Sequence, residues 1–214
     1  FDDLGNKLRV TVDELIAIIR TTVEKWHKEI KVYNLSLSCT PQNRNTSASI
    51  KDDIIHQLAS EIDSLSRKYD TLFVICTGNI PWGSLDPYPT TPYPSYFDDD
   101  STRIMSPGES MLGLTVGSIA LEHNAGSMAK FTEPSPFTRR GPGFCGHYKP
   151  DLVAHGGNCG NNWSQHDFLN VVGLSDKGDF LSYARGTSYS APLVTRLAAK
   201  LFENIPNASA CLIK

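Results

Sequence analysis

Apolar residues recur at helical spacing in two stretches near the start of the chain. The first stretch follows Thr11 and Glu14, whose separation is that of a capping box at a helix N-terminus, so residues 11–28 are predicted to form an amphipathic helix. Its apolar positions are Leu15, Ile18, Ile19 and Trp26. A second helix is predicted to open at Ser49 and Asp52. Its buried face is expected to comprise Ile54, Ile55, Leu58, Ile62 and Leu65.

Short apolar runs alternate with the helical stretches and predict the strands of a sheet. The run at residues 72–76 is continuously apolar, which is typical of a strand covered on both faces. The other predicted elements are strands at 30–38, 111–119 and 152–154, a hairpin at 168–173 and 180–184, and helices at 188–203 and 208–214. This alternation predicts one α/β domain over residues 1–214, a three-layer α/β/α sandwich with a mainly parallel sheet.

The segment before the last long helix, residues 185–192, has the sequence Arg-Gly-Thr-Ser-Tyr-Ser-Ala-Pro. A serine in the first turn of a helix lies at the positive end of the helix dipole among unpaired N–H groups, which favours negative charge near its Oγ. Gly186 permits a close backbone approach, and Pro192 is expected to lie within that first turn. Local chemistry leaves two interpretations open, a nucleophilic Ser188 or a helix cap formed by Thr187 or Ser188.

The Gly-Thr-Ser-x-x-x-Pro motif at residues 186–192 resembles the nucleophile segment of the subtilisin-like serine proteases, the peptidase S8 family. Other segments resemble that family in the order in which the family has them. They are 34–38, similar to the strand lining the substrate cleft; 71–79, similar to the buried strand that ends in the oxyanion asparagine; 114–119, similar to a further core strand; and 149–154, similar to the segment preceding the nucleophile region.

The resemblance implies hydrolysis of peptide bonds in a polypeptide substrate through an acyl-enzyme, with Ser188 as the nucleophile. Asn79 and the backbone N–H of Ser188 would hold the oxyanion. The substrate main chain would pair as an added strand with the first of two binding segments. The residues of these two segments are Ser36, Leu37 and Ser38, and Cys76, Thr77 and Gly78.

The aspartate and histidine that this family places before its serine have no matching segments here. Asp2 follows no apolar strand, and His155 stands where the family usually has proline. The chain is therefore expected to be the C-terminal part of a catalytic domain, truncated at the N-terminal strands and inactive by itself. A non-catalytic subtilisin-like domain, a pseudoprotease or peptide-binding scaffold, remains an alternative.

Two expectations follow for the segments that flank the implied site. The stretch between Asn79 and Met111 interleaves prolines with aromatic residues and is predicted to be a long ordered loop, either a wall or lid of the cleft or a surface loop packed by its own aromatics. Loss of the upstream strands would leave residues 30–38 as an unpaired edge. With apolar side chains such as Val32 and Leu35 exposed beside it, the chain is expected to self-associate there.

Composition adds little to this picture. The 214 residues carry 20 Lys and Arg against 23 Asp and Glu, a formal net charge of −3, which gives no case for nucleic acid or an anionic membrane. No apolar stretch is long enough to span a bilayer. The five cysteines are odd in number and irregular in spacing, which argues against a full disulfide framework and slightly favours a cytoplasmic over a secreted protein. No cofactor is expected.

Three other motifs compete with the protease interpretation. Residues 141–146 fit the pattern G-x-G-x-x-G, but no strand precedes them, so dinucleotide binding is not predicted. Ser190 replaces the second glycine that an α/β-hydrolase elbow requires. A group of soft metal ligands has the spacing of no familiar zinc module, and no metal site is predicted from it. Its members are Cys145, His147, His155, Cys159 and His166.

Overall fold

The computed structural model describes residues 10–39, 54–80, 92–175, 178 and 180–214. The helices are α1 (Val12–Trp26), α2 (Gln57–Tyr69), α3 (Thr187–Asn204) and α4 (Ala210–Ile213). The strands are β1 (Val32–Leu35), β2 (Leu72–Cys76), β3 (Leu114–Ile119), β4 (Leu152–His155), β5 (Val171–Leu174) and β6 (Leu181–Ala184).

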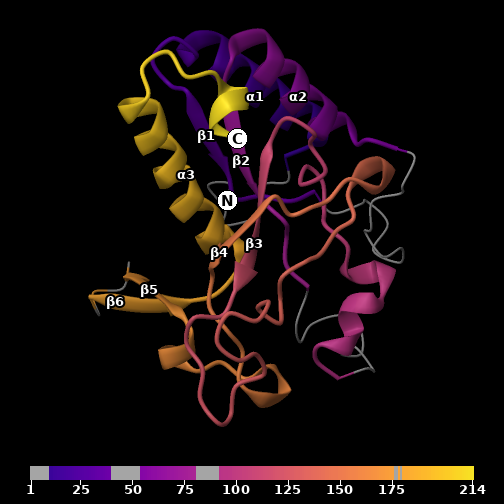
Figure 1. Cartoon of the computed structure of the whole chain (residues 1–214), viewed down its shortest axis with the longest axis vertical. Coiled ribbons are helices and arrows are strands. Elements are labelled where there is room, and N and C mark those ends of the chain that lie inside the picture. The colour runs from indigo at the N-terminus through magenta and orange to yellow at the C-terminus, as the bar shows by residue number, and fades with distance from the viewer. Residues whose placement is uncertain (1–9, 40–53, 81–91, 176–177, 179) are drawn as a thin grey trace, which may run out of the picture.

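Strands β1 to β4 form a parallel sheet in the order β1-β2-β3-β4, and β5 and β6 form a separate antiparallel hairpin. Helix α3 packs against all four strands, while α2 packs on α1 and on β2. Figure 1 shows α3 on one side of the sheet and α1 with α2 on the other. The predicted three-layer α/β/α architecture with a mainly parallel sheet is confirmed.

Strand β2 divides its side chains between two hydrophobic clusters, as the alternation of a strand requires. Leu72, Val74 and Cys76 face the cluster under α3, and Phe73 and Ile75 face the cluster under α1 and α2. All five side chains are buried, which explains why the sequence of β2 is continuously apolar: protein layers cover both faces of the strand. The sheet and its two helical layers therefore hold the carboxyl ends of β1 and β2 at a fixed place.

The two N-terminal helices begin differently from one another. Thr11 caps α1 through the predicted capping box, since Thr11 Oγ1 accepts from Glu14 N at 3.2 Å and Glu14 Oε2 accepts from Thr11 N at 2.8 Å. Helix α2 begins later than predicted, because His56 is its N-cap and accepts from Leu58 N at 3.3 Å. Ile54 lies before the helix and is 56% exposed, so its expected burial is wrong. Ser49 and Asp52 lie outside the described residues.

Strands β1 and β3 are both shorter than predicted. β3 begins at Leu114 because the Asp63 carboxylate of α2 accepts from Ser110 Oγ at 2.5 Å, Met111 N at 3.0 Å and Leu112 N at 2.9 Å. The last two of these bonds occupy backbone donors that a strand starting at 111 would need. The turn that results delivers the chain to the sheet only at Leu114.

The part of the aromatic loop that the structure describes, residues 92–110, is packed by its own rings. Tyr93, Tyr96 and Phe97 contact one another in edge-on or tilted arrangements, and they join Phe137 and Trp163 in a third hydrophobic cluster. The Tyr96 hydroxyl donates to Pro136 O at 2.6 Å, which satisfies its polar atom inside that cluster. Among the two interpretations offered above, these contacts favour the self-packed loop.

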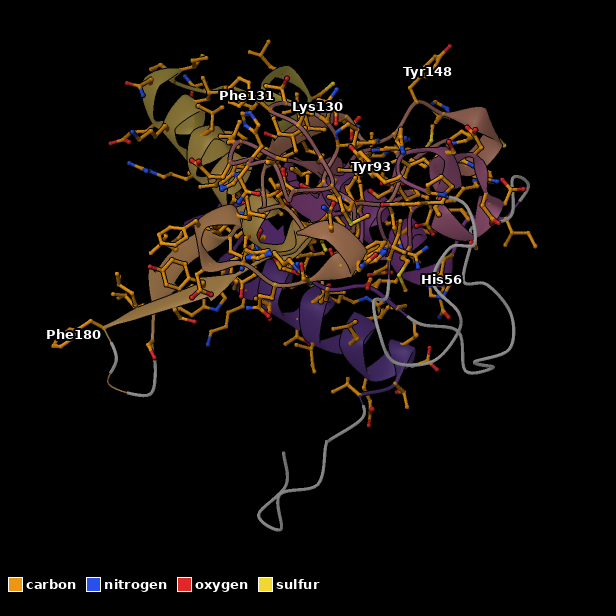
Figure 2. All side chains as sticks on the ribbon, turned by 90° about the horizontal axis from the view of Figure 1, so that it is seen from below. His56, Tyr93, Lys130, Phe131, Tyr148 and Phe180 are labelled. Carbon is orange, nitrogen blue, oxygen red and sulfur yellow. The ribbon has the colours of Figure 1, made fainter. Side chains whose placement is uncertain are left out.

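The β5–β6 hairpin confirms the predicted hairpin and carries strongly exposed apolar side chains. Leu174 is 90% exposed and Phe180 86% exposed. Figure 2 shows Phe180 at the far end of this hairpin, pointing away from the rest of the molecule. No described helix is both long enough and apolar enough to cross a membrane.

Within the described residues β1 pairs only with β2, so its other side is an edge of the sheet. Val32, Leu35 and Leu37 are half-buried against the two clusters and do not form the exposed apolar face expected from the sequence. Any pairing at this edge would therefore rest mainly on backbone hydrogen bonds.

We expect the 214-residue chain to self-associate weakly through the β1 edge, because unpaired strand N–H and C=O groups are a template for a second strand. Light scattering on the purified chain at micromolar concentrations, with hydrogen exchange of the residue 32–35 amides, measures this. A monomer in which these amides exchange slowly would contradict the expectation, because it would show the edge to be covered already.

Candidate functional site

The first turn of α3 lies against the carboxyl ends of the sheet strands through a glycine contact. Gly186, the residue before α3, donates its N–H to Gly156 O at 2.8 Å. A Cβ at Gly156 would lie 2.4 Å from Ser118 Oγ and from Ser190 Oγ and 2.8 Å from Gly186 O. Only glycine permits this approach, so residue 156 fixes how closely the start of α3 can reach β3 and β4.

Asn79 and Thr187 come together although 108 positions separate them in the sequence. Asn79 follows β2, and its side-chain Oδ1 accepts from Thr187 N at 2.9 Å and from Thr187 Oγ1 at 3.1 Å. The two bonds fix the carboxamide with its oxygen toward α3. Its Nδ2 donates to no acceptor within the described residues, and a Cβ at Gly186 would lie 3.3 Å from that nitrogen.

Ser188 is the second residue of α3 and is half-buried. In the described part of the chain its Oγ has no hydrogen-bond partner, and none of the six histidines, all of which are described, donates to it or accepts from it. The hydroxyl thus belongs to the residue that follows the Thr187 holding Asn79, and among the described residues it has no base to take its proton.

The carbonyl of Ser188 is held by Ser36, in the first of the two segments expected to bind substrate. Ser36 Oγ donates to Ser188 O at 3.0 Å. Pro192 explains why this carbonyl is available: it lies inside α3, four residues after Ser188, and a proline has no N–H to give to the carbonyl of residue i−4. The expectation that Pro192 lies in the first turn is wrong, because α3 already begins at Thr187.

The remaining predicted site residues contribute mainly backbone. Cys76 and Thr77 are fully buried, and Thr77 O accepts from Met105 N at 3.0 Å. Gly78 adopts a left-handed φ of +85°, and a Cβ there would lie 3.1 Å from Met105 Sδ, so a side chain at this position would be strained and crowded.

The strand-like segment after β1 presents its residues in different directions. The Leu37 side chain packs on the cluster under α1 and α2, and Leu37 O accepts weakly from Cys76 Sγ at 3.6 Å. Ser38 is exposed. The structure therefore brings Ser36, Asn79 and Ser188 together, and it turns the side chain of Leu37 into the core.

The cysteine and histidine cluster shows no metal-binding geometry among the described residues, where no three His, Cys, Asp or Glu side chains converge. Cys159 is fully buried, and burial raises the pKa of its thiol to about 12, so it stays protonated at neutral pH. Cys145 and His147 are exposed, and they lie more than 40 positions before Ser188 in the sequence.

Two residues of the site were not assigned a role from the sequence. Thr187, considered only as a helix cap, orients Asn79, and the Gly-Thr-Ser motif was the signal for it. Gly156 receives the start of α3, but a glycine that is needed for close packing has the same sequence signature as one in a flexible loop.

Comparisons with known proteins relate the chain to one protein family. The model of the subtilase family, Peptidase_S8, matches residues 3–214. The uncharacterized protein y4bN of Sinorhizobium fredii is 31% identical over 186 residues, which cover 73% of this chain and 41% of that protein. The serine protease AprX of Bacillus subtilis is 31% identical over 109 residues, covering 50% of this chain and 24% of AprX. The chain thus spans less than half the length of both relatives.

Solved structures show the same fold. The patellamide maturation protease PatA matches with a TM-score of 0.56 at 18% identity, covering 92% of this chain and 52% of that one. A protease from Pseudoalteromonas arctica matches with a TM-score of 0.53 at 20% identity, covering 86% of this chain and 42% of that one. At such identities the likeness concerns the fold alone.

We predict that Ser36→Ala lowers the free energy of unfolding by about 1 kcal/mol, because it leaves the Ser188 carbonyl without its donor. In a Pro192→Ala background the cost should fall to less than half, since the alanine would supply the missing helical N–H. Denaturant unfolding of the two single variants and the double variant measures the coupling. Equal costs of Ser36→Ala in both backgrounds would contradict the prediction.

Proposed function

The chain belongs to the subtilase family, and from that premise we propose that it carries the nucleophile and the oxyanion donors of a serine endopeptidase. Ser188 is the proposed nucleophile, and Asn79 with the backbone N–H of Ser188 forms the proposed oxyanion hole. The observation that carries this proposal is the orientation of the Asn79 carboxamide, whose oxygen is engaged twice by Thr187.

That orientation matters because an amide group has one end that accepts and one that donates. With Oδ1 held by Thr187 N and Thr187 Oγ1, the opposite Nδ2 is the end left to donate, and it lies 3.3 Å from where a Cβ at Gly186 would stand. A donor that is already oriented needs no reorganisation when charge develops on a substrate carbonyl oxygen, and this is the main source of oxyanion stabilisation.

The reaction so proposed is acyl transfer in two steps. Ser188 Oγ attacks the peptide carbonyl carbon, a base takes the hydroxyl proton, and that proton passes to the departing amine as the C–N bond breaks. Water then attacks the acyl-enzyme, and Ser188 regains its proton. Because no described side chain accepts from Ser188 Oγ, we propose that a histidine and an aspartate outside these 214 residues supply the base.

The proposed substrate is an extended polypeptide that pairs with residues 36–38. Pairing of β1 with β2 ends at Leu35, and the chain continues beyond it next to Ser188 with Ser38 exposed. A substrate strand added there would gain affinity from main-chain hydrogen bonds. Side-chain preference would then come from the surface next to Ser188, where Tyr189 is exposed.

A non-catalytic subtilase domain that binds peptides is the second candidate. The observation that favours it is the unpartnered Ser188 hydroxyl described above. The two candidates differ in one result: a catalytic protein has peptidase activity that is abolished by Ser188→Ala, and a binding domain keeps its peptide affinity in that variant without any turnover.

In a preparation of the natural protein that hydrolyses a fluorogenic peptide, we predict that Thr187→Val lowers kcat by about fivefold, the equivalent of one hydrogen bond of about 1 kcal/mol, with KM little changed. Asn79→Ala should lower kcat by about 100- to 1,000-fold, the magnitude known for the oxyanion donor of subtilisin itself.

Thr195→Val is the matched control for this prediction. Thr195 also lies on α3, and its hydroxyl also bonds an asparagine side chain, donating to Asn34 Oδ1 at 3.1 Å, but it does not contact Asn79. Its kcat should stay at the wild-type value. A Thr187→Val variant with wild-type kcat, or a Thr195→Val variant equally impaired, would contradict the assigned role of Thr187.

We further predict that the 214-residue chain alone has no measurable peptidase turnover, because its serine hydroxyl stays protonated without a base. The measurement is incubation with a fluorogenic peptide and with a fluorophosphonate probe. Turnover above that of a Ser188→Ala control, with stoichiometric labelling of Ser188, would show that the chain contains its own base.

A further inference from the structure

Arg139 places a buried guanidinium directly behind Asn79. The residue is 6% exposed, and its three hydrogen bonds all go to backbone carbonyls. Nε donates to Asn79 O at 2.9 Å, and one terminal nitrogen, Nη1, donates to Ser101 O at 2.7 Å and to Arg103 O at 2.9 Å. No carboxylate within the described residues forms an ion pair with it.

A buried cation without a counter-ion is costly, and the cost is offset here only by these carbonyl contacts. Burial lowers the pKa of Arg139 to about 10, so the side chain stays charged at neutral pH. A structural anchor for a loop could use a neutral donor at a smaller desolvation cost. The guanidinium differs from a neutral donor in that this one group donates to three separate carbonyls at once.

The peptide group between Asn79 and Ile80 is held at both ends by a single neighbouring segment. Its oxygen accepts from Arg139 Nε, and its N–H, on Ile80, donates to Phe137 O at 2.7 Å. With this plane fixed, the Cα of Asn79 is fixed as well. The direction of the Asn79 side chain then depends on the rotation about its Cα–C bond and on its side-chain torsions, which the two bonds from Thr187 restrict.

We propose that Arg139 is a positioning residue for the oxyanion donor: it holds the Asn79 backbone so that Nδ2 stands at the oxyanion position before substrate binds. The proposal rests on the function proposed above for Asn79. It predicts a loss in kcat and not in substrate affinity, since a displaced donor weakens an interaction made only in the transition state.

Arg140 provides a matched control in the next position of the chain. Its guanidinium also binds backbone carbonyls of the same loop, those of Phe97 and Asp98, as well as that of the adjacent Gly141, and it pairs with Asp100 at 3.7 Å. It makes no contact with Asn79. Arg140→Gln therefore removes a comparable loop anchor without altering the support of the proposed donor.

Arg139→Lys separates the two roles that Arg139 itself could have. Lysine keeps a positive charge at the end of the side chain, near the carbonyls of Ser101 and Arg103, but it has a methylene where arginine has Nε. The variant therefore retains a cation for the loop and loses the specific contact with Asn79 O.

The test is the peptidase kinetics of the natural protein, normalised to active sites titrated with a fluorophosphonate and accompanied by the melting temperature of each variant. We expect Arg139→Lys and Arg139→Gln each to lower kcat about tenfold with KM within about twofold, and Arg140→Gln to leave kcat within about twofold. In an Asn79→Ala background, Arg139→Lys should cost less than about twofold, because the donor it positions is gone.

Three results would overturn the proposal. One is a wild-type kcat for Arg139→Lys, which would make Arg139 a loop anchor only. Another is a cost of Arg139→Lys that multiplies with that of Asn79→Ala, which would mean that the two act independently. The third is a wild-type kcat for Asn79→Ala, which would remove the proposed oxyanion role itself and with it the need for positioning. Should Arg139→Gln not fold, Arg139→Lys carries the whole test.

Discussion

Two hydrogen bonds from Thr187 to the Asn79 side chain set the geometry on which the site depends. They join the residue just beyond the central strand β2 to the first turn of α3. Each partner is fixed independently, Asn79 by the buried strand β2 that precedes it and by the bonds of the Asn79–Ile80 peptide to Arg139 and Phe137, and Thr187 by a helix packed on all four strands of the sheet. A polar contact between two such elements costs little additional conformational entropy, because the packing of the core has already ordered both of them. The hydrophobic layers therefore bear most of the entropic cost of positioning the site.

The same packing explains why the site needs special residues at close quarters. Gly156 lets α3 approach to a distance that any side chain would forbid, and Pro192 withholds the N–H that would otherwise engage the Ser188 carbonyl. Ser36 then uses that carbonyl to tie β1 to α3. Of these residues, Pro192 departs most clearly from what its element prefers locally, because it lies inside a helix. Local rules are expected to fail at sites where geometry matters more than stability.

The sequence predicted the layers well because they follow from periodicity. The capping box at Thr11 satisfies the backbone N–H groups at the start of a helix, and the apolar run of β2 fits a strand covered on both faces. Both are found as expected. Element boundaries were less predictable, because they depend on distant partners. Helix α2 begins at Gln57, after its N-cap His56, and the start of β3 is set by hydrogen bonds to Asp63 of α2. Asn79 and Ser188 could be placed together only through a resemblance to a family, since no spacing rule links residues so far apart. The roles of Thr187 and Arg139 depend on that juxtaposition, and so no local pattern could have revealed them.

Arginine has an unexpected structural task in the loops around the site. Residues 97–103 form short 3₁₀ turns and residues 137–143 form no helix or continuous strand, yet several of their carbonyls are buried and must be hydrogen-bonded. Arg103 donates to Pro142 O at 3.0 Å, and Arg139 and Arg140 donate to carbonyls of the facing loop. In sequence, the adjacent pair of arginines is typical of a solvated surface, and only the fold shows that Arg139 points inward. Asn79 makes only an isolated β-bridge, with Thr138, and is not held by a continuous ladder of strand hydrogen bonds. Side-chain donors of this kind can fix such a backbone. The charged side chains thereby hold the backbone of the residue for which we propose the role of oxyanion donor.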